Sequence, residues 1–262
     1  MSNTSTTRVD EVSKYYAPAE QLGTISIVLF WLNAALSFIM PYSASILDKE
    51  WSSFLQVIFL ILVLIYFSAF QISSLYLGPR AELMRRKQLL SDSFGIPLSQ
   101  DHTSLYYNNS FSPSLQRLGA STMENALFSK EIASRMLIRK RLIISGYLLV
   151  WLLVFSLRHN NLDLLTWITQ LVFSSKILAE WLKLEVFRFR CERVYNELYS
   201  HFLHKLGQDS SRAIANVLDA FVSYEAAKSN AGILLSTKNF QKLNPTLSER
   251  WKSICQKLDM QN

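Results

Sequence analysis

Four long apolar stretches divide the chain and constrain its fold more than any other feature. They cover residues 23–41, 54–77, 142–157 and 162–182. A helix that crosses about 30 Å of hydrocarbon needs roughly 20 mostly apolar residues, and two of the stretches reach that length while two come close. Because 54–77 contains no charged residue, it lacks the polar face of a helix on a water-soluble protein. The sequence therefore predicts four transmembrane helices.

The basic residues between these stretches predict the orientation of the helices. Of the 27 Lys and Arg residues, 24 lie before the first stretch, in residues 78–141 or in residues 183–262. The loops 42–53 and 158–161 hold one each, and Lys176 lies within the fourth stretch. Since basic residues next to membrane helices stay on the cytoplasmic side, we expect both termini and the central segment in the cytosol.

We expect an all-α, polytopic membrane protein with five consecutive parts. A cytosolic lead-in precedes two transmembrane hairpins, and a cytosolic helical region follows each hairpin. In chain order the parts are residues 1–22, 23–77, 78–141, 142–182 and 183–262. The composition agrees, because half of the residues are apolar and only seven are glycine. The net charge of +7 follows from the basic cytosolic regions, so it is poor evidence for a nucleic-acid ligand.

Turn-forming residues predict the helix boundaries of the first cytosolic region. Gly78-Pro79 predicts the end of the second span and the start of a new helix with Gly95 as its C-cap. The Pro-, Asn- and Ser-containing residues 96–112 predict the longest non-helical segment. Ser112-Pro113 then predicts an N-cap and the start of a helix that continues into the third span. We expect no β-strands.

Apolar periodicity predicts three helices in the second cytosolic region. One continues from the fourth span and carries an apolar stripe over residues 187–202. Another, 212–230, is capped by residues 209–211, and a last one starts at Asn244-Pro245 with a stripe over 247–258. These stripes are either packed within the chain or surfaces for a partner. The face expected on the second of these helices is Ile214, Leu218, Phe221 and Glu225.

The chain carries no motif typical of an active site. P-loop, Gly-rich dinucleotide, CxxC, HExxH and GxSxG patterns are all absent. His201 and His204 have the spacing of two metal ligands on a helix, but with no carboxylate or cysteine expected nearby, a surface or packing role is favoured. Cys191 and Cys255 both fall in the cytosol, which argues against a disulfide. We therefore expect no enzyme activity, no metal and no cofactor.

The fourth apolar stretch is a candidate for a pore or for a helix–helix contact. Its polar side chains recur at four-residue steps, and Lys176 and Glu180 are spaced to form an ion pair. Charges at such depth usually face a bundle interior or water. A lysine near the end of a span also reaches the headgroups along its own stem, so both interpretations stay open. The candidate stripe is Thr166, Thr169, Gln170, Ser174, Lys176 and Glu180.

A second candidate site is a basic cluster expected at the cytosolic membrane surface. Attraction to anionic headgroups accounts for such a cluster. The alternative is an electropositive pocket for a phosphate-bearing ligand, with Tyr106 and Tyr107 available for stacking. The basic residues are Arg80, Arg85, Arg86 and Lys87 with Arg139, Lys140 and Arg141.

Three segments between residues 85 and 136 resemble a known family. They read RRKQLLSDSFG, YYNNSFSPSLQRLGAS and ENALFSKEIASRM. Their pattern resembles small multi-span effectors of bacterial antiphage systems, either the four-span effectors encoded beside cyclic-oligonucleotide synthases or the membrane effectors of retrons. The residues that match the pattern are Asp92, Phe94, Gly95, Tyr106, Tyr107, Asn108, Asn109, Glu124, Asn125 and Phe128.

The resemblance implies a quiescent protein of the bacterial inner (cytoplasmic) membrane. Triggering would permeabilise the lipid bilayer, through a homo-oligomer, and stop the infected cell. The residues expected to receive the signal or a ligand are Arg85, Arg86, Lys87, Asp92, Tyr106, Tyr107, Asn108, Asn109, Glu124 and Asn125. Because the chain has no recognisable nucleotide-binding domain, a soluble sensor or synthase is the expected partner, with a nucleotide second messenger or nucleic acid as open alternatives. The competing class of function is a membrane anchor that holds a soluble partner and forms no pore.

Overall fold

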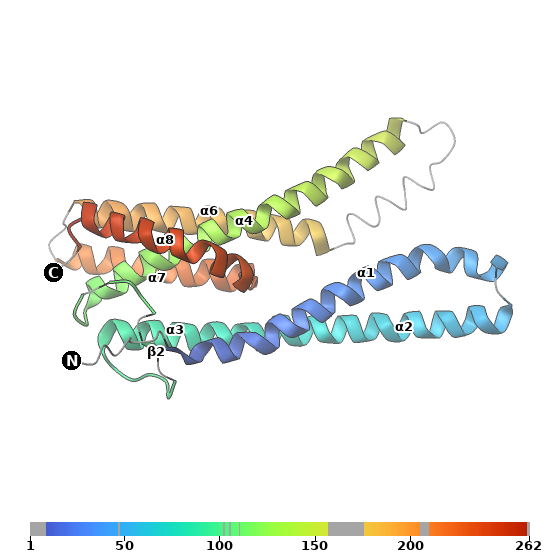
Figure 1. Cartoon of the computed structure of the whole chain (residues 1–262), viewed down its shortest axis with the longest axis horizontal. Helices are drawn as coiled ribbons and strands as arrows, with labels where there is room; N and C mark the ends of the chain where they lie inside the picture. The colour runs from blue at the N-terminus through green and yellow to red at the C-terminus, as the bar shows by residue number, and fades with distance from the viewer. Residues whose placement is uncertain are drawn as a thin grey trace. The chain divides into compact units, whose positions relative to one another are not determined.

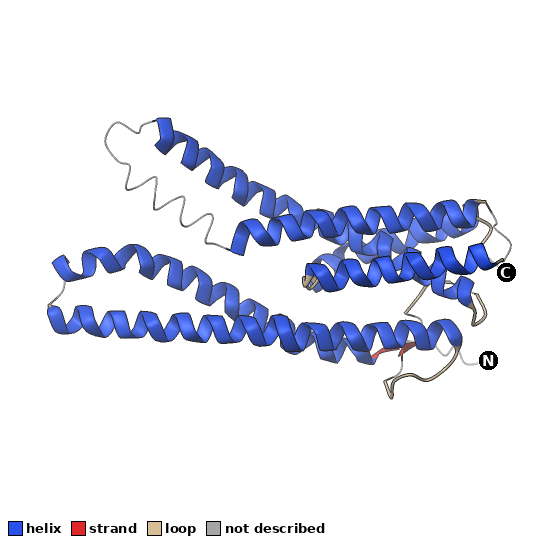
Figure 2. Ribbon diagram, turned by 180° about the vertical axis from the view of Figure 1, so that it is seen from behind, coloured by secondary structure: helices blue, strands red, loops and turns tan. Residues whose placement is uncertain are grey.

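The computed structural model confirms an all-α fold and divides the chain into two compact units. It describes residues 9–46, 48–101, 103–104, 106–109, 111–156, 176–204 and 210–260. One unit comprises Met1–Gln88 and Ser99–Ser104, and the other comprises Leu89–Leu98 and Leu105–Asn262. Within the described ranges, the only strands are two residues long each (Figure 2).

The first unit is built on an antiparallel helical hairpin. The short 3₁₀ helix η1 (Glu11–Tyr15) leads into α1 (Tyr16–Ile46), which packs beside α2 (Lys49–Ile72) (Figure 1). The strand β1 (Val9–Asp10) pairs with β2 (Thr103–Ser104), which the sequence did not predict.

Two helices of this unit are long and apolar enough to cross a membrane. They run over Glu11–Ser37 and Lys49–Phe94, and only 11% and 6% of their most apolar windows are buried. A core helix of a soluble protein would be mostly buried, so these helices expose apolar surface that water does not favour.

The second helix does not end at Gly78-Pro79, so that prediction was wrong. α2 passes through a π-helical turn, η2 (Ser73–Leu77), into α3 (Gly78–Phe94). The Gly78 N–H donates to the Ser73 carbonyl five residues earlier. A proline lacks an N–H and clashes with the preceding turn of a regular α-helix, and a local π turn accommodates this defect. The helix ends at Gly95, whose φ of 67° confirms the predicted C-cap.

The second unit packs four long helices around one apolar core. They are α4 (Leu115–Ser156), α6 (Lys176–Leu203), α7 (Ser211–Ala231) and α8 (Thr237–Lys257). α4 lies beside α6, α7 contacts both, and α8 contacts α4. The backbone of α4 at Gly119 packs closely against α6 and α7. A Cβ added there would lie 3.2 Å from Phe202 of α6 and 3.3 Å from Val217 of α7.

The predicted stripes of α6 and α8 are confirmed as parts of this core. On α6 the side chains of Phe187, Cys191, Val194, Leu198 and Phe202 are buried. On α8 the stripe from Leu247 to Leu258 is buried as well, and Trp251 is 0% exposed. Both stripes pack within the chain, so they are not free surfaces for a partner.

The predicted face of α7 was wrong, because Ile214 and Leu218 are exposed. Alanine occupies most of the face that packs, which lets α7 approach its neighbours closely and leaves larger apolar residues outside. Apolar periodicity cannot distinguish two such faces on one helix. The buried residues of α7 are Ala213, Val217, Ala220, Tyr224, Ala227 and Ala231.

Two predicted helix starts also differ from the structure. α8 begins eight residues before Pro245, with Ser236 as N-cap accepting from the Asn239 N–H at 3.3 Å. α4 begins after Ser114, whose hydroxyl accepts from the Arg117 N–H at 3.3 Å, and not at Ser112. In both cases the helix is capped by a serine other than the predicted start. Pro245 lies inside α8. The predicted cap at Ser210 of α7 is confirmed.

α4 joins the core to the third apolar stretch without a break. It is 42 residues long, or about 63 Å at 1.5 Å per residue. Its first half is buried up to Leu137, whereas further along Leu142 is 69% and Leu149 59% exposed. The structure describes the third stretch up to Ser156, and most of the fourth lies in residues 157–175, outside the described residues.

Candidate functional site

The loop before α4 is held against that helix by a buried carboxylate. Glu124 is 4% exposed. One of its oxygens accepts from Asn108 Nδ2 at 2.6 Å, and both oxygens lie within 3.3 Å of the Asn108 backbone nitrogen. Hydrogen bonds to a charged acceptor contribute about 1.5–3 kcal/mol, roughly twice a neutral bond. Glu124 is therefore the strongest anchor of this loop.

Neighbouring side chains extend the same contact along two turns of α4. Asn109 Nδ2 donates to Ser121 Oγ at 3.0 Å, and Asn125 Nδ2 donates to the Tyr107 hydroxyl at 3.3 Å. Residues that the sequence singled out as one group are thus brought together in space. We call Tyr107, Asn108, Asn109, Ser121, Glu124, Asn125 and Trp251 the loop clamp.

Trp251 connects the loop clamp to α8. Its Nε1 donates to the Asn108 carbonyl at 2.9 Å. One turn further along α8, burial raises the pKa of the Cys255 thiol to about 11, and the Glu124 charge contributes to the increase. The loop, α4 and α8 are therefore joined by one partly buried polar cluster, and a change at one member alters the contacts of the others.

Tyr106 stacks edge-on against Tyr107 at 4.9 Å between ring centroids. Because Tyr107 also accepts from Asn125, both rings have a packing role in this structure. Asn109 Oδ1 and Thr122 Oγ1 are buried and lack partners within the described ranges. Such atoms often bind an ordered water molecule.

Arg85 of the predicted basic cluster is engaged in an ion pair in the first unit. Both terminal nitrogens of Arg85 donate to Asp10 at 3.0 Å, and the guanidinium lies over the Tyr16 ring. Lys14 similarly pairs with Asp101, and this contact lowers the pKa of the aspartate. Arg85 therefore fixes the start of the chain to α3 and does not point freely toward a phosphate.

Two other residues of that cluster follow Arg85 on α3. Arg86 is half-buried and Lys87 is exposed on α3, while Asp92 is half-buried near the end of the same helix.

Ion pairs also join α4 and α6 at the base of the second apolar hairpin. Lys140 Nζ donates to Glu180 at 2.7 Å. The sequence analysis had predicted Lys176 as the partner of Glu180. Arg141 donates to both oxygens of Glu185, at 2.7 and 2.9 Å, and Trp181 Nε1 donates to the same carboxylate. The pKa of Glu185 is lowered chiefly by the hydrogen bond from Arg141.

Most of the predicted polar stripe falls in residues 157–175. Thr166, Thr169, Gln170 and Ser174 lie outside the described residues, and so does the side chain of Lys176.

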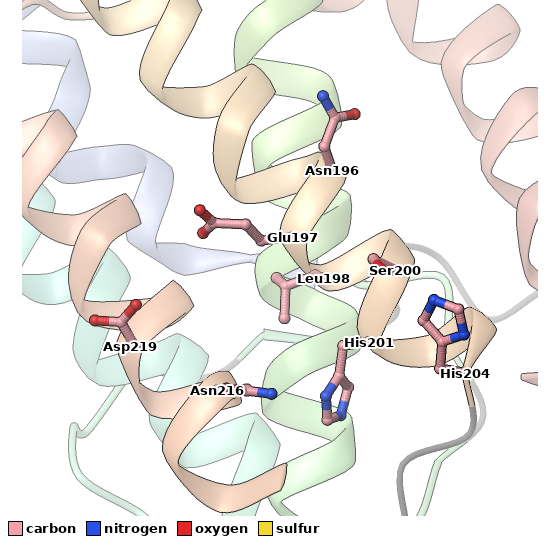
Figure 3. A pocket seen from close by; sticks show the side chains of 8 residues that line it. All are labelled: Asn196, Glu197, Leu198, Ser200, His201, His204, Asn216 and Asp219. Carbon is pink, nitrogen blue, oxygen red and sulfur yellow. The ribbon is translucent and has the colours of Figure 1, made fainter. Parts of the chain in front are cut away.

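His201 and His204 line a groove between the end of α6 and the start of α7 (Figure 3). Contrary to the expectation from sequence, carboxylates are present: Glu197 and Asp219 line the same groove. Even so, no three His, Cys, Asp or Glu side chains in the described part of the chain are placed to hold a metal ion. Burial lowers the pKa of His201, so its ring is neutral at pH 7.

Sequence reasoning missed the partners that lie far away along the chain. Asp10 and Arg85 are separated by 75 residues, and Trp251 and Asn108 by 143. The Trp251 position was predicted from its apolar stripe, but an indole N–H that bonds a loop carbonyl leaves no local signal in the sequence.

No protein-family model, curated protein or solved structure matches this chain.

Proposed function

We propose that the chain is an integral membrane protein with four spans and both termini in the cytosol. The exposed apolar surfaces of α1 and α2 and of the last turns of α4 support this proposal. The distribution of the basic residues supports the orientation. Fusions to alkaline phosphatase and to a cytosolic reporter at residue 120 and at the C-terminus test it. Phosphatase activity at either position would contradict the topology.

Within this topology, we propose that the protein is an effector of bacterial antiphage defence that permeabilises the inner membrane when triggered. The observation that carries the proposal is the continuity of α4, which runs from the loop clamp into an apolar stretch. A rigid helix transmits a displacement at one end to the other. A loss of the clamp contacts would therefore also displace the apolar end of α4, because residues 115–156 form one helix without a hinge. The resemblance of residues 85–136 to antiphage membrane effectors gives the biological setting.

Membrane potential in induced cells tests this function directly. The chain is expressed with its neighbouring genes, phage is added, and a voltage-sensitive dye reports the potential over time. Depolarisation that precedes growth arrest is expected. Cells that arrest with full potential would exclude permeabilisation.

The loop clamp provides a sharper version of the experiment. If the clamp holds the quiescent state, Glu124→Gln should depolarise cells without phage. The matched control is Glu249→Gln, which removes an exposed carboxylate on α8 and should leave cells polarised. If the two variants reach the same abundance in the membrane and give the same membrane potential, the loop clamp does not control activation.

A membrane anchor without a pore is the second candidate function. It is favoured by the apolar residues Ile214, Leu218 and Val222, which are 40–59% exposed on the water-facing α7. For this function, the purified protein would never change the conductance of a planar bilayer but would retain one soluble partner. Substituting Leu218→Glu should abolish that retention.

A further inference from the structure

At the base of the second apolar hairpin, α4 and α6 carry more positive charge than their own carboxylates balance. In segments 131–142 and 180–192 each carboxylate is already in an ion pair: Glu131, Glu180, Glu185 and Glu192. Four exposed basic side chains of the same segments have no ion pair or hydrogen bond to a described residue. They are Arg135, Arg139, Lys183 and Arg190.

One face of α4 combines two of these cations with exposed apolar side chains. Ile138 lies between Arg135 and Arg139 and is 49% exposed, and Leu142, one turn further, is 69% exposed. Residues three and four apart share a helix face, so these four side chains form one mixed stripe, the α4 stripe. Like charges four residues apart repel one another, and an anion beside them would relieve that repulsion. The α4 stripe continues without a break into the third apolar stretch.

α6 presents an equivalent stripe where it leaves the fourth apolar stretch. Val186 is 49% and Phe189 61% exposed, and they share a face with Lys183 and Arg190, which completes the α6 stripe. In the proposed topology Val186 lies four residues past the stretch, or about 6 Å at 1.5 Å per residue. Since the headgroup layer is about 5–8 Å thick on each side of the hydrocarbon, Val186 falls within it.

Ion pairs between the two helices place both stripes at the same level. Arg141 of α4 donates to Glu185 of α6 at 2.7 Å, and Lys130 pairs with Glu192 at 3.8 Å. The helices run in opposite directions side by side (Figure 1), so residues 130–141 of α4 lie along residues 185–192 of α6. The exposed cations and apolar side chains of both stripes thus occupy the same few turns of the second unit.

We propose that the α4 and α6 stripes bind the headgroups of anionic phospholipids at the membrane surface. This binding rests on the four-span topology proposed above. A lipid phosphate supplies the negative charge that the four cations lack and accepts hydrogen bonds from guanidinium groups. The acyl chains of the same lipid cover the apolar side chains beside them. A soluble polyanion would match the charges but would leave Leu142 and Phe189 in water.

Lipid titration of the full chain in a neutral detergent, with bound lipids counted by native mass spectrometry, tests this surface. Phosphatidylglycerol and phosphatidylcholine with identical acyl chains are the probes, because they differ in net charge. Each basic residue near an anionic headgroup contributes about fivefold and each stripe has two, so phosphatidylglycerol should bind about tenfold more tightly or better. Equal affinity for the two lipids would overturn the proposal even if reporter fusions support the topology. A clear preference in a chain whose fusions show another topology would support the lipid contact and reject only the four spans.

Matched variants separate the stripes from attraction to the net charge. Arg135→Gln/Arg139→Gln and Lys183→Gln/Arg190→Gln should each lower the preference for phosphatidylglycerol about fivefold or more. The control Lys252→Gln/Lys257→Gln removes two charges from exposed positions of α8 and should keep the preference. Phe189→Ala removes an exposed apolar contact and should weaken both lipids by the same factor. Equal losses in the control and in both stripe variants, at unchanged thermal midpoints of unfolding, would overturn the proposal.

Discussion

In the first unit the long helices leave their large apolar side chains uncovered, whereas in the second unit the core-facing stripes of α4, α6 and α8 bury such side chains. Leu60 and Leu64 of α2 are 60% and 65% exposed, while Leu198 of α6 and Trp251 of α8 are at most 1% exposed. The α1–α2 hairpin therefore exposes apolar surface that water does not favour. The core of the second unit gains its stability from burial away from water.

Polar contacts follow the same division. At the ends of the first hairpin, Arg85 and Asp10 make a bidentate ion pair. Along the apolar part of α1 and α2, Asn33 Nδ2 donates to the Leu62 carbonyl at 3.3 Å. The second unit instead joins the buried side chains of Glu124 and Trp251 to the exposed Asn108 of the loop before α4. The first unit thus combines an exposed apolar surface with ion pairs at its ends, and the second combines a closed apolar core with a polar cluster.

The largest expected effect comes from a tryptophan in each region. Trp251→Ala removes a fully buried ring and its hydrogen bond to Asn108, so it should destabilise the second unit by about 3–5 kcal/mol. Trp51→Ala in α2 removes a ring that is 63% exposed and should change the same unfolding transition little. Urea titration in detergent micelles, followed by far-UV circular dichroism, measures both.

Thiol labelling tests the difference between the Trp251→Ala and Trp51→Ala variants independently. Both cysteines are buried in the second unit, and burial raises the pKa of Cys191 to about 12. Maleimide at pH 7.5 should therefore label the native protein slowly and the Trp251→Ala variant fast, because opening exposes the thiols. Fast labelling of Trp51→Ala would show that the two regions do not differ as described.

A smaller effect is expected at the loop clamp. Glu124→Gln keeps one acceptor oxygen but places an amide next to donors of Asn108, so about 1.5–3 kcal/mol should be lost. Urea unfolding of the full chain measures the loss, and Glu249→Gln is the control at an exposed site. A variant as stable as the control would mean that Glu124 does not anchor the loop.

The all-helical fold and the two buried stripes could be predicted because each depends on local spacing. Trp251 was assigned to an apolar stripe from its neighbours at Leu247 and Ile254 alone, and that assignment is confirmed. The face of α7 was not predictable, since Ile214 and Leu218 carry more apolar surface than the alanines that pack. The partner of Asn108 depends on how distant helices meet, which no local pattern records.

A still smaller effect is expected for the ion pair between Arg141 and Glu185 at the base of the second apolar hairpin. Arg141 lowers the pKa of Glu185, so the contact stabilises the fold above the unfolded value near 4.3 and is lost as pH falls through the folded value. Because the Arg141 side chain is 53% exposed, Glu185→Gln should cost only a fraction of the Glu124→Gln loss at pH 7. The difference from wild type should shrink when unfolding is repeated between pH 5 and pH 3. A difference that stays constant over this range would exclude the charge as its cause.

The smallest effect is expected at Asn33, within the apolar hairpin. Its Oδ1 is buried and has no partner among the described residues, while its Nδ2 makes only the 3.3 Å bond to Leu62. Asn33→Leu removes a weak contact and an unsatisfied acceptor together, and leucine is favoured in hydrocarbon. The two changes oppose each other, and interhelical hydrogen bonds in membranes average about 0.6 kcal/mol, so the hairpin should change by less than about 1 kcal/mol. Unfolding by sodium dodecyl sulfate in mixed micelles measures this, with Leu60→Ala as a control at an exposed, lipid-facing position. A loss above 2 kcal/mol for Asn33→Leu would mean that Asn33 has a stronger partner in the membrane, and the hairpin would then depend on polar contacts as the second unit does.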